Sequence, residues 1–302
     1  MVEIKNVAVS GASGTIGVPV VKALLDSGKF TVSVLARESS KSTYPPGVKV
    51  LRVDFESVAS LTSALKGQDA VISTVGNDGM AGQTKVIDAA IAAGVKRFLP
   101  SAFGSDVENP LVAALPVFAH KVMVEKHLEA AIAEQKGEKM TYTYFRNGIF
   151  LDWGIEVGFF FDVKTGKTPL YDGGDQPFST TTLASVGKGV VSVLEHYEET
   201  KNRAVFVHDL AISQKKLVEI GKKVAPEKAW ETELVLTSET KAKSDEGLAK
   251  GDYSGAVMIP YLYNSIWTEG YGGYYEKVDN ELLGLPLMTE DDVERIMRKI
   301  LV

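Results

Sequence analysis

The segment Val7–Gly17, which reads VAVSGASGTIG, decides the fold of this chain. An apolar run is followed by glycines at every third position, and an amphipathic stretch begins where the glycines end. A turn from a strand into a helix needs glycine where the backbone is tight and where an anion must approach it closely. The first turn of such a helix offers unpaired N–H groups and a partial positive charge to a phosphate. The pattern predicts a dinucleotide-binding loop, a glycine-rich structural turn being the alternative, with contacts from Gly11, Ser13, Gly14, Thr15, Ile16 and Gly17.

Apolar β-branched runs alternate with amphipathic helical stretches through the first half of the chain. This alternation is typical of a parallel sheet covered by helices on both faces. It predicts an α/β fold with a Rossmann-type doubly wound parallel sheet, in which residues 1–150 form the dinucleotide-binding domain. The expected strands are Lys5–Ser10, Thr31–Ala36, Val48–Val53, Ala70–Thr74, Arg97–Pro100 and Thr141–Arg146, and the expected helices are Thr15–Ser27, Ser57–Leu65, Gln83–Ala93 and Pro116–Gln135.

The pattern changes after about Asn147, where aromatic residues become frequent and the alternation ends. We expect residues 151–302 to form a smaller, mainly substrate-binding region that returns strands or helices to the main domain. Its expected elements are a strand at Arg203–His208, a helix at Ser213–Val224, an edge strand at Trp230–Leu236, a solvated helix and loop over Ser238–Asp252 and a terminal helix at Asp291–Leu301.

The composition excludes several classes of function. Of the 302 residues, 33 are Lys or Arg and 39 are Asp or Glu, so the net charge is −6 and nucleic-acid binding is not expected. There is no cysteine, and the four histidines lack metal-ligand spacing, so we expect no metal site. No run approaches the ~18 apolar residues of a membrane span, and the first ten residues resemble a strand rather than a leader peptide. We therefore expect a cytoplasmic monomer or homodimer whose partner is a small-molecule substrate, with no membrane partner.

Residues after the second strand indicate which dinucleotide binds. Arg37 and Lys41 offer positive charge in the region where NAD-binding proteins place a carboxylate for the ribose. A guanidinium matches a 2′-phosphate through forked, charge-assisted hydrogen bonds, so NADP(H) is favoured over NAD(H). Two alternatives stay open: Glu38 binds the ribose hydroxyls, or Arg37 is a solvated surface charge. At the ends of the next two strands the expected contacts, for which ordinary turn chemistry would also account, are Asp54, Phe55, Thr74, Val75 and Gly76.

Two further motifs resemble those of one family of reductases. The stretch Lys96–Gly104 reads KRFLPSAFG, and Val117–Lys121 reads VFAHK. With the glycine loop and Arg37, they resemble the isoflavone reductase-like and NmrA-like branch of the atypical short-chain dehydrogenases. The resemblance implies NADPH-dependent reduction of a phenolic or other aromatic natural product, with Lys121 in acid–base catalysis. The cofactor positions that we expect on this basis are Gln83, Ser101, Phe103 and Lys121 itself.

The chain also departs from that family pattern, and the departures bear on the substrate. Ala102 stands where the plant enzymes usually have Glu, and Asn147 comes one place early. Aromatic side chains suit ring-bearing ligands because they offer flat apolar surface with a few polar tips. The residues that we expect to border the substrate are Phe103, Phe150, Trp153, Tyr271 and Tyr274, although Phe150 and Trp153 could instead belong to the core.

Lys121 falls within an apolar stripe on the helix expected from Pro116. The stripe consists of residues at helical spacing, namely Val117, Val124, Leu128, Ala131 and Ile132. Loss of water on that face lowers the pKa of a lysine toward a useful acid–base range, unless the ammonium extends out to solvent. His120 is a second candidate for proton transfer. The rival prediction is a non-catalytic, NmrA-like redox sensor that binds NADP and acts through a protein partner, and such a sensor has no need of Lys121.

Overall fold

The computed structural model describes residues 2–302, which form two compact units that interleave along the chain. Unit 1 consists of Met1–Phe103, His120–Phe145 and Leu183–Val205, and unit 2 consists of Gly104–Ala119, Arg146–Thr182 and Phe206–Val302. The chain therefore returns from unit 2 to unit 1 twice, and its last segment belongs to unit 2. Each unit is described by itself below.

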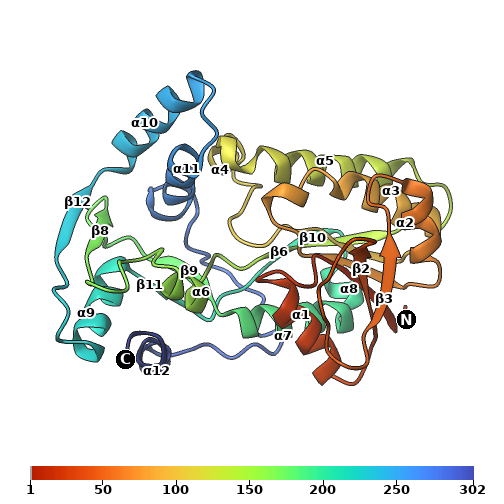
Figure 1. The fold of residues 1–302 in the computed structure, drawn as a ribbon, viewed down its shortest axis with the longest axis horizontal. Helices are drawn as coiled ribbons and strands as arrows, with labels where there is room; N and C mark the ends of the chain where they lie inside the picture. Colours follow the sequence, from red (N-terminus) through yellow and green to blue (C-terminus); the bar gives the residue numbers. More distant parts are fainter. Residues whose placement is uncertain (1) are drawn as a thin grey trace. The chain divides into compact units, whose positions relative to one another are not determined.

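The central feature of unit 1 is a parallel sheet with the strand order β10-β6-β5-β4-β1-β2-β3 (Figure 1). Every pairing from β3 through β6 is parallel. The chain runs outward from β1 to β3 and then returns to β4 on the other side of β1, so the order reverses at β1 and β4. In doubly wound sheets, such a reversal leaves a crevice at the carboxyl ends of the strands, where ligands bind. The strands are β1 (Asn6–Ser10), β2 (Thr31–Arg37), β3 (Lys49–Val53), β4 (Ala70–Ser73), β5 (Arg97–Leu99), β6 (Thr141–Arg146) and β10 (Arg203–Phe206).

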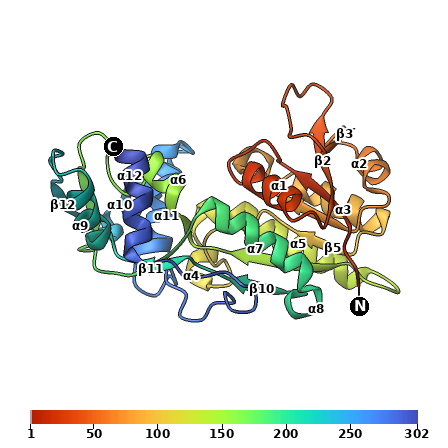
Figure 2. The same ribbon diagram turned by 90° about the horizontal axis from the view of Figure 1, so that it is seen from below.

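Helices cover both faces of this sheet, as the alternating pattern predicts (Figures 1 and 2). One face carries α1 (Gly17–Asp26) and α7 (Leu183–Glu195), and the other carries α2 (Val58–Leu65), α3 (Gln83–Ala93) and α5 (Ala119–Glu134). Helices α1 and α7 lie side by side because Gly187 leaves room for the α1 backbone: a Cβ there would come within 2.6 Å of the Pro19 carbonyl oxygen.

A buried arginine ties the returning segment to the sheet. Arg97 of β5 donates hydrogen bonds to Thr143 (2.7 Å) and Thr200 (3.0 Å) and to the Tyr197 carbonyl oxygen (2.6 Å). Burial lowers the pKa of Arg97 to about 10, so the guanidinium stays charged at neutral pH. A buried charge is tolerated when its donors are satisfied, as they are here. The short helix α8 (Tyr197–Thr200) supplies two of these partners.

Unit 2 is built from short strands and helices around an aromatic core. Its three-stranded sheet contains β7 (Ile149–Phe150), β9 (Phe178–Thr181) and β11 (Leu210–Ile212), and β8 (Thr168–Tyr171) pairs with β12 (Thr232–Val235). Large side chains such as Phe160, Phe178 and Trp267 are buried at its centre. The helices are α4 (Pro110–Ala113), α6 (Leu151–Glu156), α9 (Gln214–Val224), α10 (Thr237–Ala249), α11 (Gly255–Trp267) and α12 (Glu290–Leu301).

The structure differs from the sequence-based expectations at a few element ends. The helix expected from Pro116 begins as a 3₁₀ turn (η2, Pro116–Phe118), and the α-helix starts only at Ala119; such turns are frequent at helix starts. Strand β5 ends before Pro100, which has no N–H to donate to a neighbouring strand. The edge strand expected at Trp230–Leu236 exists as β12, which spans only Thr232–Val235 and pairs with β8. Among residues 2–302, no helix combines the length and the apolar character that a membrane crossing requires.

Candidate active site

The loop between β1 and α1 has the backbone that the glycine pattern predicts. Gly11 has φ +76°, and a Cβ at this position would lie 2.7 Å from the Thr74 carbonyl carbon. A Cβ on Gly17 would collide with the Gly11 carbonyl oxygen, so α1 can start this close to the loop only with glycine there. No side chain caps α1. The N-terminus of α1 therefore has no side-chain acceptor for its first N–H groups, which suits an anion.

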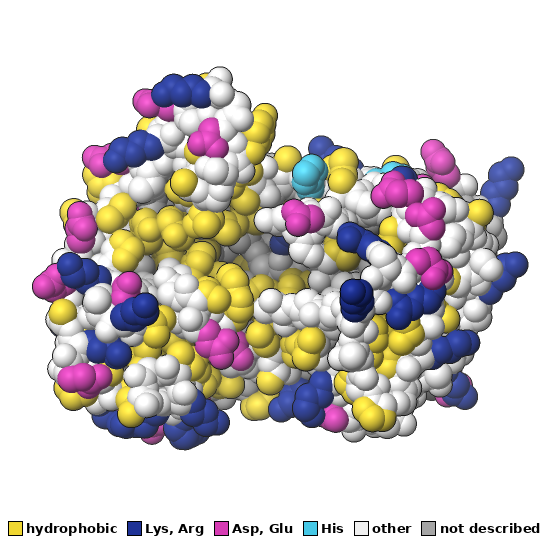
Figure 3. Space-filling view, in the orientation of Figure 1, with side chains coloured by type: hydrophobic (Ala, Val, Ile, Leu, Met, Phe, Trp, Pro, Cys, Tyr) yellow, Lys and Arg dark blue, Asp and Glu magenta, His cyan; other side chains and the backbone are white. Residues whose placement is uncertain are grey.

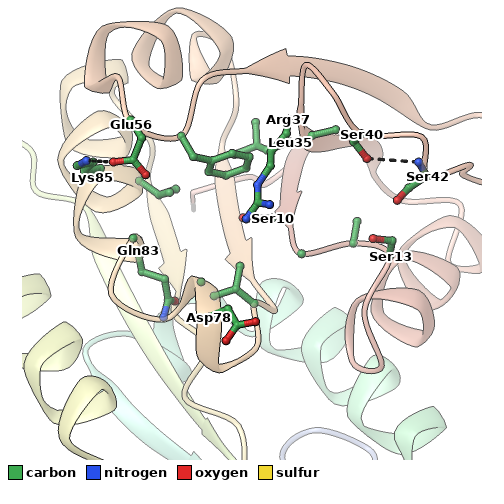
Figure 4. A pocket seen from close by; sticks show the side chains of 18 of the residues that line it. Ser10, Ser13, Leu35, Arg37, Ser40, Ser42, Glu56, Asp78, Gln83 and Lys85 are labelled. Atoms are coloured by element: carbon green, nitrogen blue, oxygen red, sulfur yellow. Dashed lines mark hydrogen bonds and ion pairs between the residues drawn. The ribbon is translucent and has the colours of Figure 1, made fainter.

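A cavity of about 820 Å³ opens beside this loop in unit 1 (Figure 4). Its walls come from the β1–α1 loop, the end of β2 with the residues that follow it, the start of the β3–α2 connection and the segment from β4 into α3. The cavity thus lies at the reversal of strand order described above, where a dinucleotide is expected. The predicted cofactor residues that line it are Gly11, Ser13, Arg37, Phe55, Val75 and Gln83.

The side chain of Arg37 extends from the end of β2 toward the middle of this cavity (Figure 4). Glu38, the next residue, is exposed and is not among the lining residues. The Arg37 guanidinium makes no hydrogen bond or ion pair with any residue between 2 and 302, so its donors are available to a ligand. Lys41 is exposed and also lies outside the lining.

Other predicted cofactor residues lie around the cavity without lining it. The Thr74 hydroxyl donates to the Ser10 carbonyl oxygen (2.8 Å) and so holds the end of β4 against β1. The carboxylate of Asp54 accepts from the Glu56 N–H (2.9 Å), which is ordinary turn chemistry. The remaining predicted residues outside the lining are Gly14, Thr15, Ile16, Gly17, Gly76, Ser101, Phe103 and Lys121.

Ser101 is linked to the cavity wall through two hydrogen bonds. Its N–H donates to the Gln83 side-chain oxygen (2.8 Å), and its hydroxyl donates to the Val75 carbonyl oxygen (2.8 Å). The amide nitrogen of Gln83 donates to the Met80 carbonyl oxygen (3.2 Å). Gln83 and Ser101 are both buried, so these contacts fix the wall after β4.

Lys121 lies in the first turn of α5 and is half-buried, and its ammonium donates to the Phe103 carbonyl oxygen. The neighbouring stripe residues Val124 and Leu128 are buried, which agrees with the predicted face. Glu125, which follows Val124 in the helix, is also buried, with 7% of its surface exposed. His120 is exposed.

The predicted substrate residues fall in both units. Phe103 belongs to unit 1 and is 3% exposed, and its ring packs against Phe145 with centroids 5.7 Å apart. In unit 2, Phe150 and Trp153 are both half-buried and meet edge to face with centroids 6.3 Å apart. Tyr271 is half-buried.

Tyr274 is the most exposed of the predicted substrate residues. It is 39% exposed, and its ring is parallel to that of His208, with centroids 6.4 Å apart. Burial lowers the pKa of His208, whose Nδ1 lies 2.9 Å from the Ser179 hydroxyl.

Two aromatic residues of unit 2 that were not among the predicted substrate residues, Phe159 and Tyr263, continue the group of rings formed by Phe150 and Trp153. Phe159 lies 6.5 Å from Trp153 and 5.4 Å from Tyr263, measured between ring centroids, and both Phe159 and Tyr263 are half-buried. We call Phe150, Trp153, Phe159 and Tyr263 the aromatic row. Hydrophobic side chains gather on this unit around β8 and α11, as the left half of Figure 3 shows.

A comparison with models of protein families shows to which family the chain belongs. The model of the NmrA-like family matches residues 3–246. This chain belongs to the NmrA-like family. Within residues 2–302 of this family member, no group of histidine, aspartate and glutamate side chains has the arrangement of a metal site.

Similar proteins are named as oxidoreductases and reductases. Oxidoreductase aprR of Aspergillus flavus is 35% identical over 294 residues, which cover 95% of this chain and 97% of that protein. Eugenol synthase 1 of Petunia hybrida is 38% identical over 163 residues, about half of each chain. The structure of AtPrR2 with NADP+ and (+)pinoresinol has a TM-score of 0.78 at 23% identity and covers both chains fully. This NmrA-like family member is an oxidoreductase with the fold of these reductases.

Sequence reasoning missed part of the cavity wall. Ser39, Ser40 and Ser42 line the cavity, and the serine-rich stretch after Arg37 was a usable signal for them. Lys85 and Glu56 form an ion pair at another side of the cavity (Figure 4), but only the fold brings these two residues together. The other lining residues that were not predicted are Ser10, Ala12, Leu35, Ala36, Tyr44, Asp78, Gly79, Ala81, Gly82 and Val86.

Proposed function

We propose that this NmrA-like protein is an NADPH-dependent reductase of a bulky, partly aromatic small molecule. The observation that carries the proposal is the cavity at the strand-order reversal, which Arg37 enters and Glu38 does not line. A guanidinium with free donors favours the 2′-phosphate over the bare ribose of NADH.

The residues around the cavity fit a phosphorylated dinucleotide. The Gly11 backbone and the N-terminus of α1 would hold the pyrophosphate, and a Cβ on Gly11 or Gly17 would collide with the backbone that shapes this loop. Arg37 and the serine hydroxyls that follow it would hold the 2′-phosphate. When bound, NADPH supplies a hydride. The structures of AtPrR2 and of leucoanthocyanidin reductase from Vitis vinifera, which share this fold, contain NADP+ and NADPH respectively.

Lys121 is the proposed acid–base residue. Its stem lies on the apolar face of α5, and its ammonium is held at the Phe103 carbonyl oxygen, so the amine has a defined position. In such a place the ammonium form can donate a proton to an oxygen that gains charge during reduction, and the neutral amine can accept a proton from a phenol. Lys121 would thus handle the proton that accompanies the hydride.

The aromatic row supports the proposed substrate class. Half-buried rings that meet one another edge to face or at a tilt give an apolar aromatic surface, which favours ligands that carry rings of their own. Relatives named eugenol synthase and phenylcoumaran benzylic ether reductase match about half of this chain. We therefore propose phenylpropanoids, flavonoids and related secondary metabolites as the first compounds to test.

The deciding experiment measures NADPH consumption against a panel of phenylpropanoid, flavonoid and quinone-like compounds, with identification of each product. Turnover of at least one compound by the wild type, and not by Lys121→Met, supports the proposal. Tight NADPH binding with no turnover across the panel would contradict it and would favour a sensor that acts through a protein partner.

A further inference from the structure

One wall of the cavity is formed by a segment without regular structure. Residues 38–48 connect β2 to β3 and contain neither helix nor strand, yet the stretch 37–44 supplies five lining residues: Arg37, Ser39, Ser40, Ser42 and Tyr44. Within this segment the backbone hydrogen bonds are few: Ser40 N–H donates to the Arg37 carbonyl oxygen (3.0 Å), and Val48 N–H to that of Pro45 (3.4 Å). Such a segment needs contacts from outside to keep one conformation.

Arg52 provides those contacts. Its Nη1 donates to two carbonyl oxygens at once, that of Arg37 (2.9 Å) and that of Ser40 (2.8 Å). These two carbonyls are the first and last of the turn that begins the segment. Because a guanidinium donates in fixed directions, one nitrogen bonded to both ends holds the turn closed.

The sheet explains why this arginine reaches the turn. In the parallel pairing of β2 with β3, Arg52 lies opposite Ala36, one residue before the turn starts. Strand β3 is at the edge of the sheet, and Arg52 is exposed. Its side chain can therefore pass over the end of β2 to the carbonyls beyond it. Arg52 itself is not among the residues that line the cavity.

We propose that Arg52 is a positioning residue for nucleotide selectivity: by holding the Arg37–Ser40 turn closed, it presents Arg37 and the serine hydroxyls to a phosphate monoester on the ribose of the ligand. The inference rests on the proposed function, because it takes the ligand to be NADPH. It adds a residue that does not touch the ligand and acts only through the turn. The part of the ligand affected is the 2′-phosphate, which NADH lacks.

The size of the effect follows from the population of the closed turn. Without Arg52, the turn keeps one backbone hydrogen bond and samples other conformations. If the closed form falls to about a tenth of the population, the apparent Kd for a ligand that needs it rises about tenfold. Arg52→Met keeps the aliphatic stem and removes both hydrogen bonds. We expect the Kd of NADPH to rise about 5- to 10-fold and that of NADH to stay within about twofold.

The test compares Arg52→Met with Lys49→Met by calorimetric titration of NADPH and NADH. Lys49→Met is the matched control because it removes one exposed positive charge from the same strand and leaves both turn hydrogen bonds intact. Hydrogen exchange of the ligand-free protein is measured in parallel over residues 38–48. We expect faster exchange there in Arg52→Met only.

Each outcome of these measurements either supports or overturns the positioning role of Arg52. A selective loss of NADPH affinity with faster exchange in residues 38–48 supports the positioning role. Equal losses for NADPH and NADH, or a selective loss without faster exchange, would overturn it, since the first indicates a general structural role and the second a direct effect of charge. Unchanged NADPH affinity would overturn it as well. The proposed function is tested separately by the wild type, which must prefer NADPH before any variant is compared.

Discussion

Replacing Arg37 tests the assignment of the cofactor most directly. Arg37→Met removes the guanidinium but leaves the backbone of the turn intact, because the contacts of residue 37 with Ser40 and Arg52 use its carbonyl oxygen. The side chain is exposed and has no partner among residues 2–302. The folded protein therefore loses no internal interaction, and the free energy of unfolding should stay within about 0.5 kcal/mol of the wild type.

The expected loss of affinity follows from the exposure of the site. A hydrogen bond to a charged group contributes about 1.5–3 kcal/mol, and solvent at an exposed position favours the lower half of that range. At 1.4 kcal/mol for each factor of ten, NADPH should bind about 10- to 40-fold more weakly. NADH has no phosphate at this position, so its Kd should change less than about twofold.

The assay is calorimetric titration at physiological salt with NADPH and NADH, repeated with 2′,5′-ADP and 5′-AMP to isolate the 2′-phosphate. Glu38→Gln serves as the control because Glu38 is the neighbouring residue and does not line the cavity. If Glu38→Gln weakened NADH binding while Arg37→Met left NADPH binding unchanged, the carboxylate would be the ribose ligand and the reasoning from Arg37 would be refuted.

The remaining predictions concern catalysis, loop packing and pH. Lys121→Met should reduce turnover by about 100-fold or more with NADPH affinity unchanged, and equal turnover in the folded variant would remove Lys121 from the mechanism. Gly17→Ala should lower the free energy of unfolding in urea by about 1–3 kcal/mol because its Cβ meets backbone, whereas Gly76→Ala, with open space around it, should change little; similar losses in both would contradict the packing argument. Because the pKa of His208 is lowered in the folded state below its ordinary 6.5, the unfolded state takes up the proton first, so stability is full above pH 6.5 and declines as the pH falls below it. Urea unfolding between pH 5 and 8 should show a flatter profile for His208→Gln, and an unchanged profile would exclude His208 as the cause.

The sequence predicted those parts of the molecule that local patterns determine. The turn at Gly11 is an example, because a positive φ and close backbone packing leave only one residue type and the spacing repeats at Gly17. The stripe around Lys121 is another, since helical periodicity places its members on one face. In both cases the signal is a local pattern in the sequence, the glycine spacing at Gly11–Gly17 and the helical spacing at Val117–Ile132.

Other parts depend on contacts between distant segments and could not be predicted in this way. The sequence analysis expected the second half to return elements to the main domain but could not say which: the contacts that bind residues 183–205 to unit 1 include the bonds of Arg97 to Thr200 and the Tyr197 carbonyl, about a hundred residues further on. The aromatic row requires Phe159 to meet Tyr263, which only tertiary packing brings together. The resemblance to a family supplied Gln83 and Ser101, whose mutual hydrogen bond has no signature in spacing.

The cavity has a part whose residues are needed for the fold and a part whose residues are not. The first part is the ends of the strands with the glycine loop, and the second is the wall that carries Arg37, on which we expect nucleotide selectivity to depend. The strand ends are held by buried contacts, such as that of Thr74 with Ser10, and any side chain at Gly11 would meet backbone. Substitutions at these positions are therefore expected to lower the stability of the fold itself, whatever they do to ligand affinity. The wall that carries Arg37, by contrast, is exposed and is closed by Arg52 from an edge strand, so substitutions in it cost the fold little. Nucleotide preference in this chain can therefore change through a few exposed residues while the sheet and its glycine loop stay the same.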